Sequence, residues 1–341
     1  MKNWKQFWQV KQNRKLTLVF AAAVLFLIAA ILMNFCLGAA KLSFADVFDA
    51  MKNGVTGVAG RIFWYARFPR TIACLLAGAA LAVSGAVIQN VLTNKLASPS
   101  IIGVNAGAGL AVTICLATGA MSGWMIAGAS FAGAMTAVLL VAVVSRKIGA
   151  SRTTVILGGV AVNSCLNAAS EAITILVPEV GIQAGDFRVG GFSSVVYTRL
   201  IPAGVLIVVG LIVLFTLCID LDVMSLGEDT AQGLGLPVKK MRTIFLVLAA
   251  LLAGASVSFA GLLGFVGLIV PHAGRKLVSS DSRMLLPFCA IGGAAFVTFC
   301  DLVARTLFAP YEIPVGILMS FIGGPFFLFL LASRRGGHGH D

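Results

Sequence analysis

One stretch of sequence decides the fold: Arg67-Phe68-Pro69-Arg70, then Leu76-Ala77-Gly78-Ala79-Ala80-Leu81-Ala82-Val83-Ser84-Gly85, then Gln89-Asn90, and finally Asn94-Lys95-Leu96-Ala97-Ser98-Pro99. Its apolar part is long enough for a spanning helix, since the hydrocarbon core of a bilayer takes about 20 apolar residues. The many small residues allow neighbouring helices to approach closely, which is how helices associate in lipid. The stretch therefore indicates a membrane helix that begins after two arginines and ends in a polar hairpin.

The composition of the whole chain agrees with a membrane protein. Of its 341 residues, 59% are hydrophobic and only 11% are charged, and the mean hydropathy is +1.00. A soluble domain of this size cannot bury so much apolar surface. The apolar segments lack the two-residue alternation of barrel strands, so an all-α, polytopic helical bundle is predicted. Ten transmembrane helices are expected near residues 16–37, 70–91, 101–118, 122–144, 153–177, 198–219, 243–261, 262–278, 286–306 and 314–332.

The net charge of +12 is distributed in a way that predicts topology. Basic residues cluster at the ends of spans and no separate polar domain exists, so nucleic acid is excluded as a partner and the lipid bilayer is expected. The clusters are Lys2, Lys5, Lys11, Arg14 and Lys15; Arg146, Lys147 and Arg152; Arg275, Lys276 and Arg283; and Arg334 and Arg335. With ten spans all four fall on one side, which places both termini in the cytoplasm. The expected organisation is a tail over 1–15, one membrane domain over 16–333 and a tail over 334–341.

The two halves of the chain share a short pattern. Leu76-Ala77-Gly78-Ala79 is followed by Gly85, and Leu252-Ala253-Gly254-Ala255 is followed at the same offset by Gly261. The expected topology runs these two helices in opposite directions. An inverted repeat of spans 2–5 and 7–10 is one interpretation. A chance match in a chain with 38 glycines is the other.

Catalytic and metal motifs are missing from the sequence. The seven cysteines lie in apolar segments without a C-x-x-C pair and are interpreted as packing residues. The terminal His338 and His340 could bind a metal weakly or belong to a disordered tail. No G-x-x-x-x-G-K-[ST] phosphate loop occurs, so the chain is not expected to hydrolyse ATP or to hold a cofactor.

The fifth expected span carries a polar stripe: Asn163, Asn167, Ser170, Glu171 and Thr174. Their offsets place all five on one helical face. An ionisable residue such as Glu171 is costly in contact with lipid and should face protein or water. The stripe is interpreted either as the lining of a translocation path or as a set of hydrogen bonds between helices.

Two further segments suggest contacts with partner proteins. Residues 224–240, between spans six and seven, predict a short helix over Gly227 to Gln232 that is capped by Ser225, followed by a second helix from Pro237. This segment is either a knob for a cytoplasmic partner or an ordinary loop. Three arginines, Arg67, Arg70 and Arg305, are expected on the outside. They could bind carboxylates of an external partner or extend to lipid phosphates.

These elements, together with Gly264-Phe265-Val266-Gly267-Leu268-Ile269-Val270-Pro271-His272-Ala273-Gly274-Arg275 and Asp301-Leu302-Val303-Ala304-Arg305, resemble the FecCD/BtuC-like permease subunits of ABC importers for iron-siderophores, haem and cobalamin. The resemblance covers roughly residues 60 to 332. It implies that segment 224–240 forms coupling helices that contact an ATPase through Gly227, Glu228, Ala231, Leu234 and Gly235. It also implies that Arg67, Arg70 and Arg305 contact an external binding protein. Asn94, Leu96 and Ser151 match the family's cytoplasmic gate, although Lys95 stands where the family usually has proline.

The resemblance also implies the partners and the activity. Two ABC ATPase subunits that bind the ATP, an extracytoplasmic substrate-binding protein and a second permease subunit are expected, and a homodimer is favoured over a heterodimer. The expected function is import of an iron-siderophore or similar metal chelate across the cell membrane of a prokaryote, with haem or cobalamin as the alternative cargo. A rival interpretation is an ion-coupled secondary transporter that uses Glu171 and Asp301 as intramembrane carboxylates.

Overall fold

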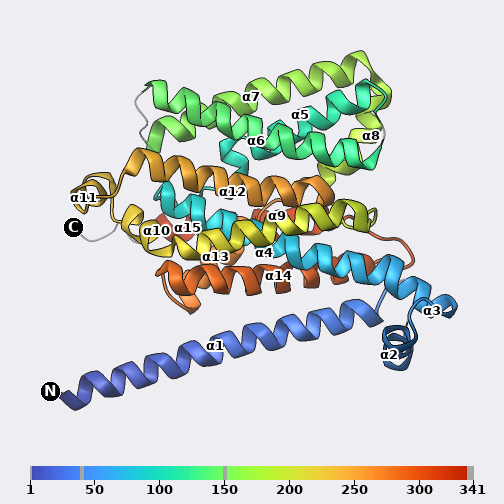
Figure 1. Cartoon of the computed structure of the whole chain (residues 1–341), viewed down its shortest axis with the longest axis horizontal. Coiled ribbons are helices and arrows are strands. Elements are labelled where there is room, and N and C mark those ends of the chain that lie inside the picture. Colours follow the sequence, from blue (N-terminus) through green and yellow to red (C-terminus); the bar gives the residue numbers. More distant parts are fainter. Residues whose placement is uncertain (1, 39–41, 121, 149–151, 336–341) are drawn as a thin grey trace.

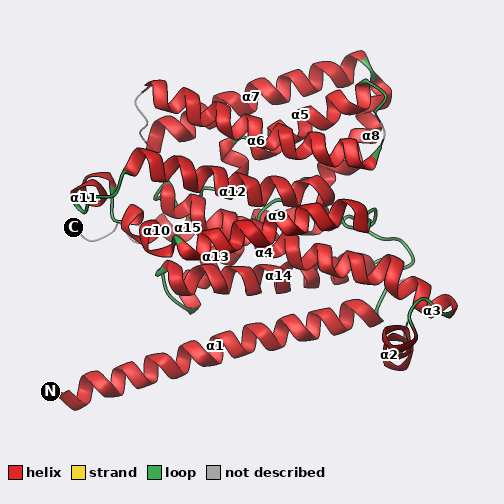
Figure 2. Ribbon diagram, in the orientation of Figure 1, coloured by secondary structure: helices red, strands yellow, loops and turns green. Residues whose placement is uncertain are grey.

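The structure is a computed structural model that describes residues 2–38, 42–120, 122–148 and 152–335. Within these residues every regular element is helical, as Figure 2 shows. The longer helices are α1 (Lys2–Cys36), α4 (Phe68–Val91), α5 (Val104–Ala117), α6 (Gly123–Ile148), α7 (Arg152–Leu176), α9 (Tyr197–Thr216), α12 (Val238–Ala260), α13 (Val266–Leu277), α14 (Ser282–Thr306) and α15 (Val315–Arg335). The shorter ones are α2 (Phe44–Asn53), α3 (Gly57–Ile62), α8 (Pro178–Val189), α10 (Cys218–Ser225) and α11 (Glu228–Gly233), with a π-helical turn η1 (Phe63–Arg67) and a 3₁₀ turn η2 (Pro99–Ile102). The all-α prediction is confirmed.

Seven helical segments in the described residues are long and apolar enough to cross a membrane. They belong to α1, to α4 with the turns before it, and to α6, α7, α9, α12 and α14; α5 and α15 are shorter and equally apolar. The helix α1 begins at Lys2, so the residues expected as an N-terminal tail continue the first helix. The histidine tail with His338 and His340 lies outside the described residues.

The eighth expected span differs from the prediction. Residues 261–264 are not helical, and α13 has only 12 residues. A helix of that length rises about 18 Å, whereas the hydrocarbon core is about 30 Å thick. The apolar run 262–270 resembles a span in composition, but Gly261 has a φ of +69° and Phe265 a φ of +65°, so the chain turns sharply before α13 begins. The segment is a half-span that is preceded by non-helical backbone.

The same order of helices occurs twice. The helices α4, α5, α6 and α7 are long, short, long and long, and so are α12, α13, α14 and α15. In both halves irregular or 3₁₀ backbone precedes the short helix. Figure 1 shows α4 and α12 running in opposite directions across the bundle. The shared order supports an inverted repeat over a chance match.

The helix α4 lies at the centre of the bundle, between α12 and α14 (Figure 1). Two glycines on α4 allow backbone contact with its neighbours: a Cβ on Gly78 would lie 2.2 Å from the carbonyl oxygen of Gly293, and one on Gly85 would lie 2.1 Å from that of Gly267. Helices in lipid gain their association energy from such close packing. The small residues of α4 therefore hold α13 and α14 against it.

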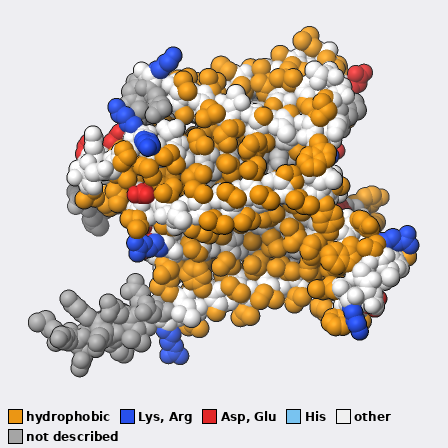
Figure 3. Space-filling model, viewed as in Figure 1, with side chains coloured by type: hydrophobic (Ala, Val, Ile, Leu, Met, Phe, Trp, Pro, Cys, Tyr) orange, Lys and Arg blue, Asp and Glu red, His pale blue; other side chains and the backbone are white. Residues whose placement is uncertain are grey.

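The two ends of the bundle differ. Figure 1 places α10, α11, the start of α1 and the end of α15 at one end, here called the inner end, and α2, α3 and α8 at the other, the outer end. Figure 3 shows hydrophobic side chains over the middle of the molecule, with most of the charged side chains near the ends. The arrangement is that of a multi-pass membrane protein, with an apolar band between two polar rims.

Candidate functional site

The polar stripe on α7 is divided by its neighbours. Asn163 is half-buried, and its amide donates to the carbonyl oxygens of Ser100, at 2.8 Å, and Ile101, at 3.2 Å. Ser170 is buried and shares a hydrogen bond of 2.9 Å with the hydroxyl of Thr113. These two residues therefore tie α7 to η2 and α5, which agrees with the second of the two interpretations of the stripe.

The other part of the stripe is open. Asn167 and Glu171 are exposed, while Thr174 is half-buried and donates to the carbonyl oxygen of Glu171 at 2.8 Å. On a helix that turns about 100° per residue, Ser170 and Glu171 point about 100° apart. Among the five residues of the stripe, Asn167 and Glu171 are the two that the structure leaves exposed.

The hairpin after α4 is well ordered. The carboxamide oxygen of Asn94 accepts from the backbone N–H of Leu96 at 3.0 Å, and its backbone carbonyl accepts from the N–H of Ala97 at 3.0 Å. This Asx turn fixes the loop without the proline that the family usually has at residue 95. Lys95 is exposed, while Asn94 and Leu96 are half-buried. The third residue expected at the gate, Ser151, lies outside the described residues.

The helices α10 and α11 form the inner surface between α9 and α12. Leu226 and Leu234 are 61% and 63% exposed there, so they present apolar side chains to the outside of the bundle. Gly227 and Gly235, with φ values of +117° and +86°, frame α11 in backbone conformations that favour glycine. This pair of short helices, with two exposed leucines, is a surface suited to a protein partner.

Three details of this surface differ from the sequence-based prediction. Ser225 does not cap α11, since its hydroxyl donates to the carbonyl of Asp222 and the N-cap is Gly227. Ala231 is fully buried, so it supports α11 and does not face a partner. The helix expected from Pro237 is the start of α12 itself.

Glu228 also has a role within the chain. Its carboxylate accepts from Nη2 of Arg242 on α12 at 2.8 Å, and Arg242 is buried. The bond joins the first turn of α11 to α12, and an acidic residue in a first turn is itself favoured by the helix dipole. Arg242 was not singled out from the sequence because it follows Lys239 and Lys240 just before the seventh expected span, where flanking basic residues are common.

Two of the three arginines that were expected to contact an external binding protein or lipid phosphates are buried within the chain. Arg67 and Arg305 are only 5% and 2% exposed. Arg67 donates to backbone carbonyls at the end of α1, those of Asn34, Phe35 and Leu37. Arg305 donates to the backbone carbonyl and the side-chain oxygen of Asn34. In this conformation neither arginine is available to an external carboxylate.

Asn34 is the centre of this cluster and is fully buried. It receives hydrogen bonds from Arg67, Arg305 and Thr71, and its own amide donates to the carbonyl of Thr298 at 3.2 Å. It thereby joins α1 to α4 and α14. In the sequence, one feature could have pointed to Asn34: it is a polar residue near the end of an otherwise apolar span, where a polar side chain requires a partner.

Arg70 is the outer arginine whose guanidinium hydrogen-bonds acidic side chains. Its guanidinium binds Asp301 on α14, with Nη2 2.9 Å from Oδ1, and Glu312, with Nη1 2.7 Å from Oε2. Asp301 is buried, and it also lies 3.8 Å from Nε of Arg305. Asp301 is thus held between two arginines, which removes it as the free carboxylate that an ion-coupled transporter would need.

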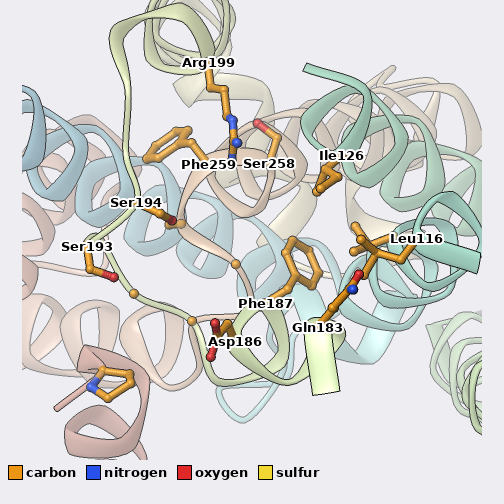
Figure 4. Close-up of a pocket in the computed structure, with 16 residues that line it drawn as sticks. Leu116, Ile126, Gln183, Asp186, Phe187, Ser193, Ser194, Arg199, Ser258 and Phe259 are labelled. Atoms are coloured by element: carbon orange, nitrogen blue, oxygen red, sulfur yellow. The ribbon is translucent and has the colours of Figure 1, made fainter. Parts of the chain in front are cut away.

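A recess of about 290 Å³ opens at the outer end, beneath α8. Its polar lining is Gln183, Asp186, Ser193, Ser194, Arg199 and Ser258. Figure 4 shows Arg199, from the start of α9, pointing into this recess beside Phe259 and Ser258, with Asp186 on the other side. Because Arg199 and Asp186 place opposite charges on two walls of the recess, the recess suits a polar ligand group more than an apolar one. The sequence did not single out Arg199, because it stands at the edge of an expected span like other flanking basic residues.

The protein is similar to known transport proteins along almost its whole length. Residues 25–333 match the FecCD transport family. The chain is 35% identical over 324 residues to the Fe(3+)-citrate import system permease protein YfmD of Bacillus subtilis, covering 93% of this chain and 95% of that one. It is 33% identical over 341 residues to the vitamin B12 import system permease protein BtuC of Citrobacter koseri, covering 98% and 100%.

A solved structure has the same fold. It is an inward-facing ABC transporter assigned to the metal-chelate type, and it superimposes with a TM-score of 0.84 at 28% identity, covering 93% of this chain and 99% of that one. The overall arrangement of helices described above is therefore shared with an ABC transporter. Since the family match covers most of the sequence and the relatives align along nearly their full length, this chain belongs to the FecCD transport family.

Proposed function

We propose that this chain is the membrane-spanning permease subunit of an ATP-driven importer in the cell membrane of a prokaryote. Its cargo would be a ferric chelate, handed over by an extracytoplasmic binding protein. The observation that carries the proposal is the full-length match to import-system permeases, together with a fold shared with an ABC transporter. The ferric-chelate cargo follows from the similarity to YfmD. Haem and cobalamin are the competing cargoes.

Energy for transport would come from two separate ATPase subunits, which bind the ATP. The sequence has no phosphate-binding loop of its own. The exposed leucines Leu226 and Leu234 on the inner surface supply an apolar contact of the kind that protein partners use. Gly227, Glu228, Ala231 and Gly235 would act indirectly, by holding α11 in place.

A second permease subunit would complete the path, and a second copy of this chain is the favoured partner. The helix α7 is exposed around more than half of its circumference, and its exposed face includes Ser164, Ala168 and Ala172 at four-residue spacing. Small residues at this spacing are typical of helix pairs in membranes. Asn167 and Glu171 border that face, so they would line the path between two copies. Asn94 and Leu96, with Ser151, would close its inner end.

The binding protein would dock at the outer end. Of the three arginines expected to receive it, Arg70 lies nearest the surface, where it is bound to the half-exposed Glu312. Docking through Arg67 or Arg305 would require that arginine to leave its buried hydrogen bonds with Asn34. The Arg70–Glu312 region is therefore the favoured contact.

Reconstitution tests the proposal. The chain is placed in liposomes with candidate ATPase and binding-protein subunits, and uptake of iron-55 citrate, haem and cobalamin is measured with and without ATP. Uptake of ferric citrate that requires both partners and ATP is the expected result. Uptake driven by a proton or sodium gradient in liposomes containing this chain alone would overturn it.

A further inference from the structure

Four helices meet around one arginine at the inner end of the bundle. Arg275 lies in the last turn of α13 and is half-buried. Its Nη2 donates to the side-chain oxygen of Asn90 at 3.0 Å, and its Nη1 donates to the side-chain oxygen of Gln89. Both acceptors lie in the last turn of α4. A guanidinium group can hold two acceptors in a fixed geometry because its donors are arranged in a rigid plane.

Gln89 also binds the other end of α13, and the sequence explains why. In a helix the carbonyl of Gly267 would accept from the N–H four residues later, but that residue is Pro271, which has no N–H. The side-chain amide of Gln89 donates to this carbonyl at 2.8 Å. The close approach of Gly85 to Gly267 brings α4 near enough for this bond. Gln89 therefore fixes the end of α4 to both the first and the last turn of α13.

Asn90 extends the network to α10. Its amide donates to the hydroxyl of Ser282, the first residue of α14, at 3.2 Å. The backbone N–H of Ser282 in turn donates to the carboxylate of Asp222 on α10 at 2.9 Å. Burial raises the pKa of the Asp222 carboxyl, and the hydrogen bond from Ser282 opposes that change by stabilising the charged form. A continuous set of hydrogen bonds thus runs from α10 through α14 and α4 to α13.

The hairpin that follows α4, residues 92–97, carries the expected gate residues and is here called the gate hairpin. It is bonded to the backbone of Gln89 and Asn90. The backbone N–H of Asn94 donates to the carbonyl of Gln89 at 3.0 Å, and that of Thr93 donates to the carbonyl of Asn90 at 3.2 Å. Thr93 has a φ of +44°, and among the described residues only Thr93 and Phe265 have a positive φ without being glycine. A β-branched residue in that conformation is strained and is held there by its surroundings. The position of the hairpin therefore depends on how Gln89 and Asn90 are held.

In the described part of the chain Arg275 forms no ion pair, and its two partners are neutral amides. This differs from Arg70, which binds two carboxylates at the outer end. Hydrogen bonds to neutral acceptors are weaker than those between two charged groups. Contacts of this kind position a segment and can still exchange during a conformational cycle.

We propose that Arg275 is a positioning residue for transport: it holds the gate hairpin, residues 92–97, in register with α10, so that a displacement of α10 and α11 by an ATPase reaches Asn94 and Leu96. This inference rests on the proposed function and adds to it the residues through which the inner surface and the gate are coupled. Deleting the guanidinium should leave ATP hydrolysis intact and separate it from movement of the hairpin.

The test uses the complex of permease, ATPase and binding protein in lipid nanodiscs and liposomes. Arg275→Gln is compared with Arg275→Lys and with Lys276→Gln, which removes the same charge from the neighbouring, exposed residue of α13. The first readout is the number of cargo molecules moved per ATP hydrolysed. The second is the distance between spin labels attached at Lys95→Cys, and how much this distance changes when nucleotide binds. The labelled protein also carries serine in place of the exposed Cys165.

For Arg275→Gln we expect ATP hydrolysis within about twofold of wild type, at least a tenfold loss of cargo moved per ATP, and loss of the nucleotide-dependent change in label distance. Arg275→Lys should recover part of the cargo moved per ATP and part of the change in label distance. Lys276→Gln should match wild type. Wild-type transport and label movement in Arg275→Gln would overturn the proposal. A wild-type complex that assembles no ATPase would count against the proposed function and not against this assignment.

A second variant keeps the test decisive if Arg275→Gln fails to fold. Ser282→Ala removes the hydroxyl that accepts from Asn90 but retains the backbone N–H that binds Asp222. A threefold or larger loss of cargo per ATP, combined with a reduced change in label distance, is expected. When Ser282→Ala is combined with Asn90→Leu, the loss should be no greater than for Asn90→Leu alone, because both remove one connection. Additive losses would contradict a single network.

Discussion

Arg70 on α4 and Asp301 on α14 form a buried ion pair, with Nη2 of the arginine 2.9 Å from Oδ1 of the aspartate, at the outer end of the bundle. Nε of Arg70 lies 3.1 Å from each carboxylate oxygen, so the aspartate is held by more than one donor. The neighbouring Arg305 approaches the same carboxylate. Asp301 therefore balances two cations that have little access to water.

Replacing Asp301 with asparagine should be strongly destabilising. The change leaves Arg70 and Arg305 without their buried counter-charge, and breaking one side of a buried pair costs about 3–5 kcal/mol. Unfolding in detergent, followed by scanning fluorimetry and by denaturant titration, should show a large fall in the midpoint.

Glu312→Gln is the matched control for this variant. Its side chain is 35% exposed, so water can replace the carboxylate at Arg70, and the loss should stay within about 1 kcal/mol. If Asp301→Asn and Glu312→Gln lowered the stability equally, the burial of Asp301 would not be the reason for its contribution to stability.

A second stability prediction concerns the contact between α4 and α13. In Gly85→Ala the new methyl group would lie 2.1 Å from the carbonyl oxygen and 2.4 Å from the Cα of Gly267, so backbone must move on one side or the other. Overpacking of this kind costs about 1–3 kcal/mol. The fraction of protein that remains monodisperse after heating, measured by fluorescence-detected size exclusion, should fall.

Gly128→Ala provides the comparison in another helix. Gly128 lies inside α6, and a Cβ there meets no atom within 4 Å. Alanine is favoured over glycine in a helix interior by about 1 kcal/mol, so heat tolerance should be unchanged or higher. A loss as large as that of Gly85→Ala would mean that glycine content in general, and not the contact with Gly267, sets stability.

The helical architecture could be predicted from the sequence because it depends on local quantities. Length and apolar composition located most of the spans, and Gly233 and Gly235 located the end of α11. The half-span α13 was taken for a full span, since residues 262–265 are as apolar as a helix would require. Their non-helical backbone is held by tertiary contacts such as the hydrogen bond from the N–H of Leu262 to the carbonyl of Phe187, which no local pattern reveals.

The candidate site could be predicted only in part, for the same reason. Spacing placed Asn163 and Glu171 on one face of α7, but which edge of that face is covered depends on η2 and α5. Arg67 and Arg305 were expected on the outside because the predicted ten-span topology placed them there. Their acceptors come largely from Asn34 at the far end of the first helix, 33 and 271 residues away in sequence. Contacts at such separations require the fold.

The inner surface gives a prediction for assembly with the ATPase. Leu234→Arg places a charge on an exposed leucine of that surface without touching the buried Ala231. If an apolar pocket of the ATPase receives Leu234, affinity should fall at least tenfold, or about 1.4 kcal/mol. The affinity of the ATPase for nanodisc-embedded permease is measured by co-purification and by biolayer interferometry.

Leu277→Arg is the control for this surface, because Leu277 is an exposed leucine in the last turn of α13 and outside α10 and α11. Unchanged affinity for Leu234→Arg, or an equal loss for Leu277→Arg, would contradict docking through α11. Glu228→Arg is a poorer variant here, since it would set two arginines against each other at Arg242 and disturb α11 itself.

The exposed face of α7 gives the last prediction, on pairing of the permease. Ala168 lies at the middle of the small-residue face with Ser164 and Ala172, and leucine there would hold a second helix away by the size of its side chain. Ala168→Leu should weaken pairing about tenfold, as measured by single-molecule photobleaching in nanodiscs at graded protein-to-lipid ratios. Ala22→Leu makes the same change on an exposed position of α1 and should leave pairing unchanged. Because Ala168 and Ala22 are both exposed, folding of both variants should match wild type. A dimer that persists in Ala168→Leu would therefore place the second subunit on another face.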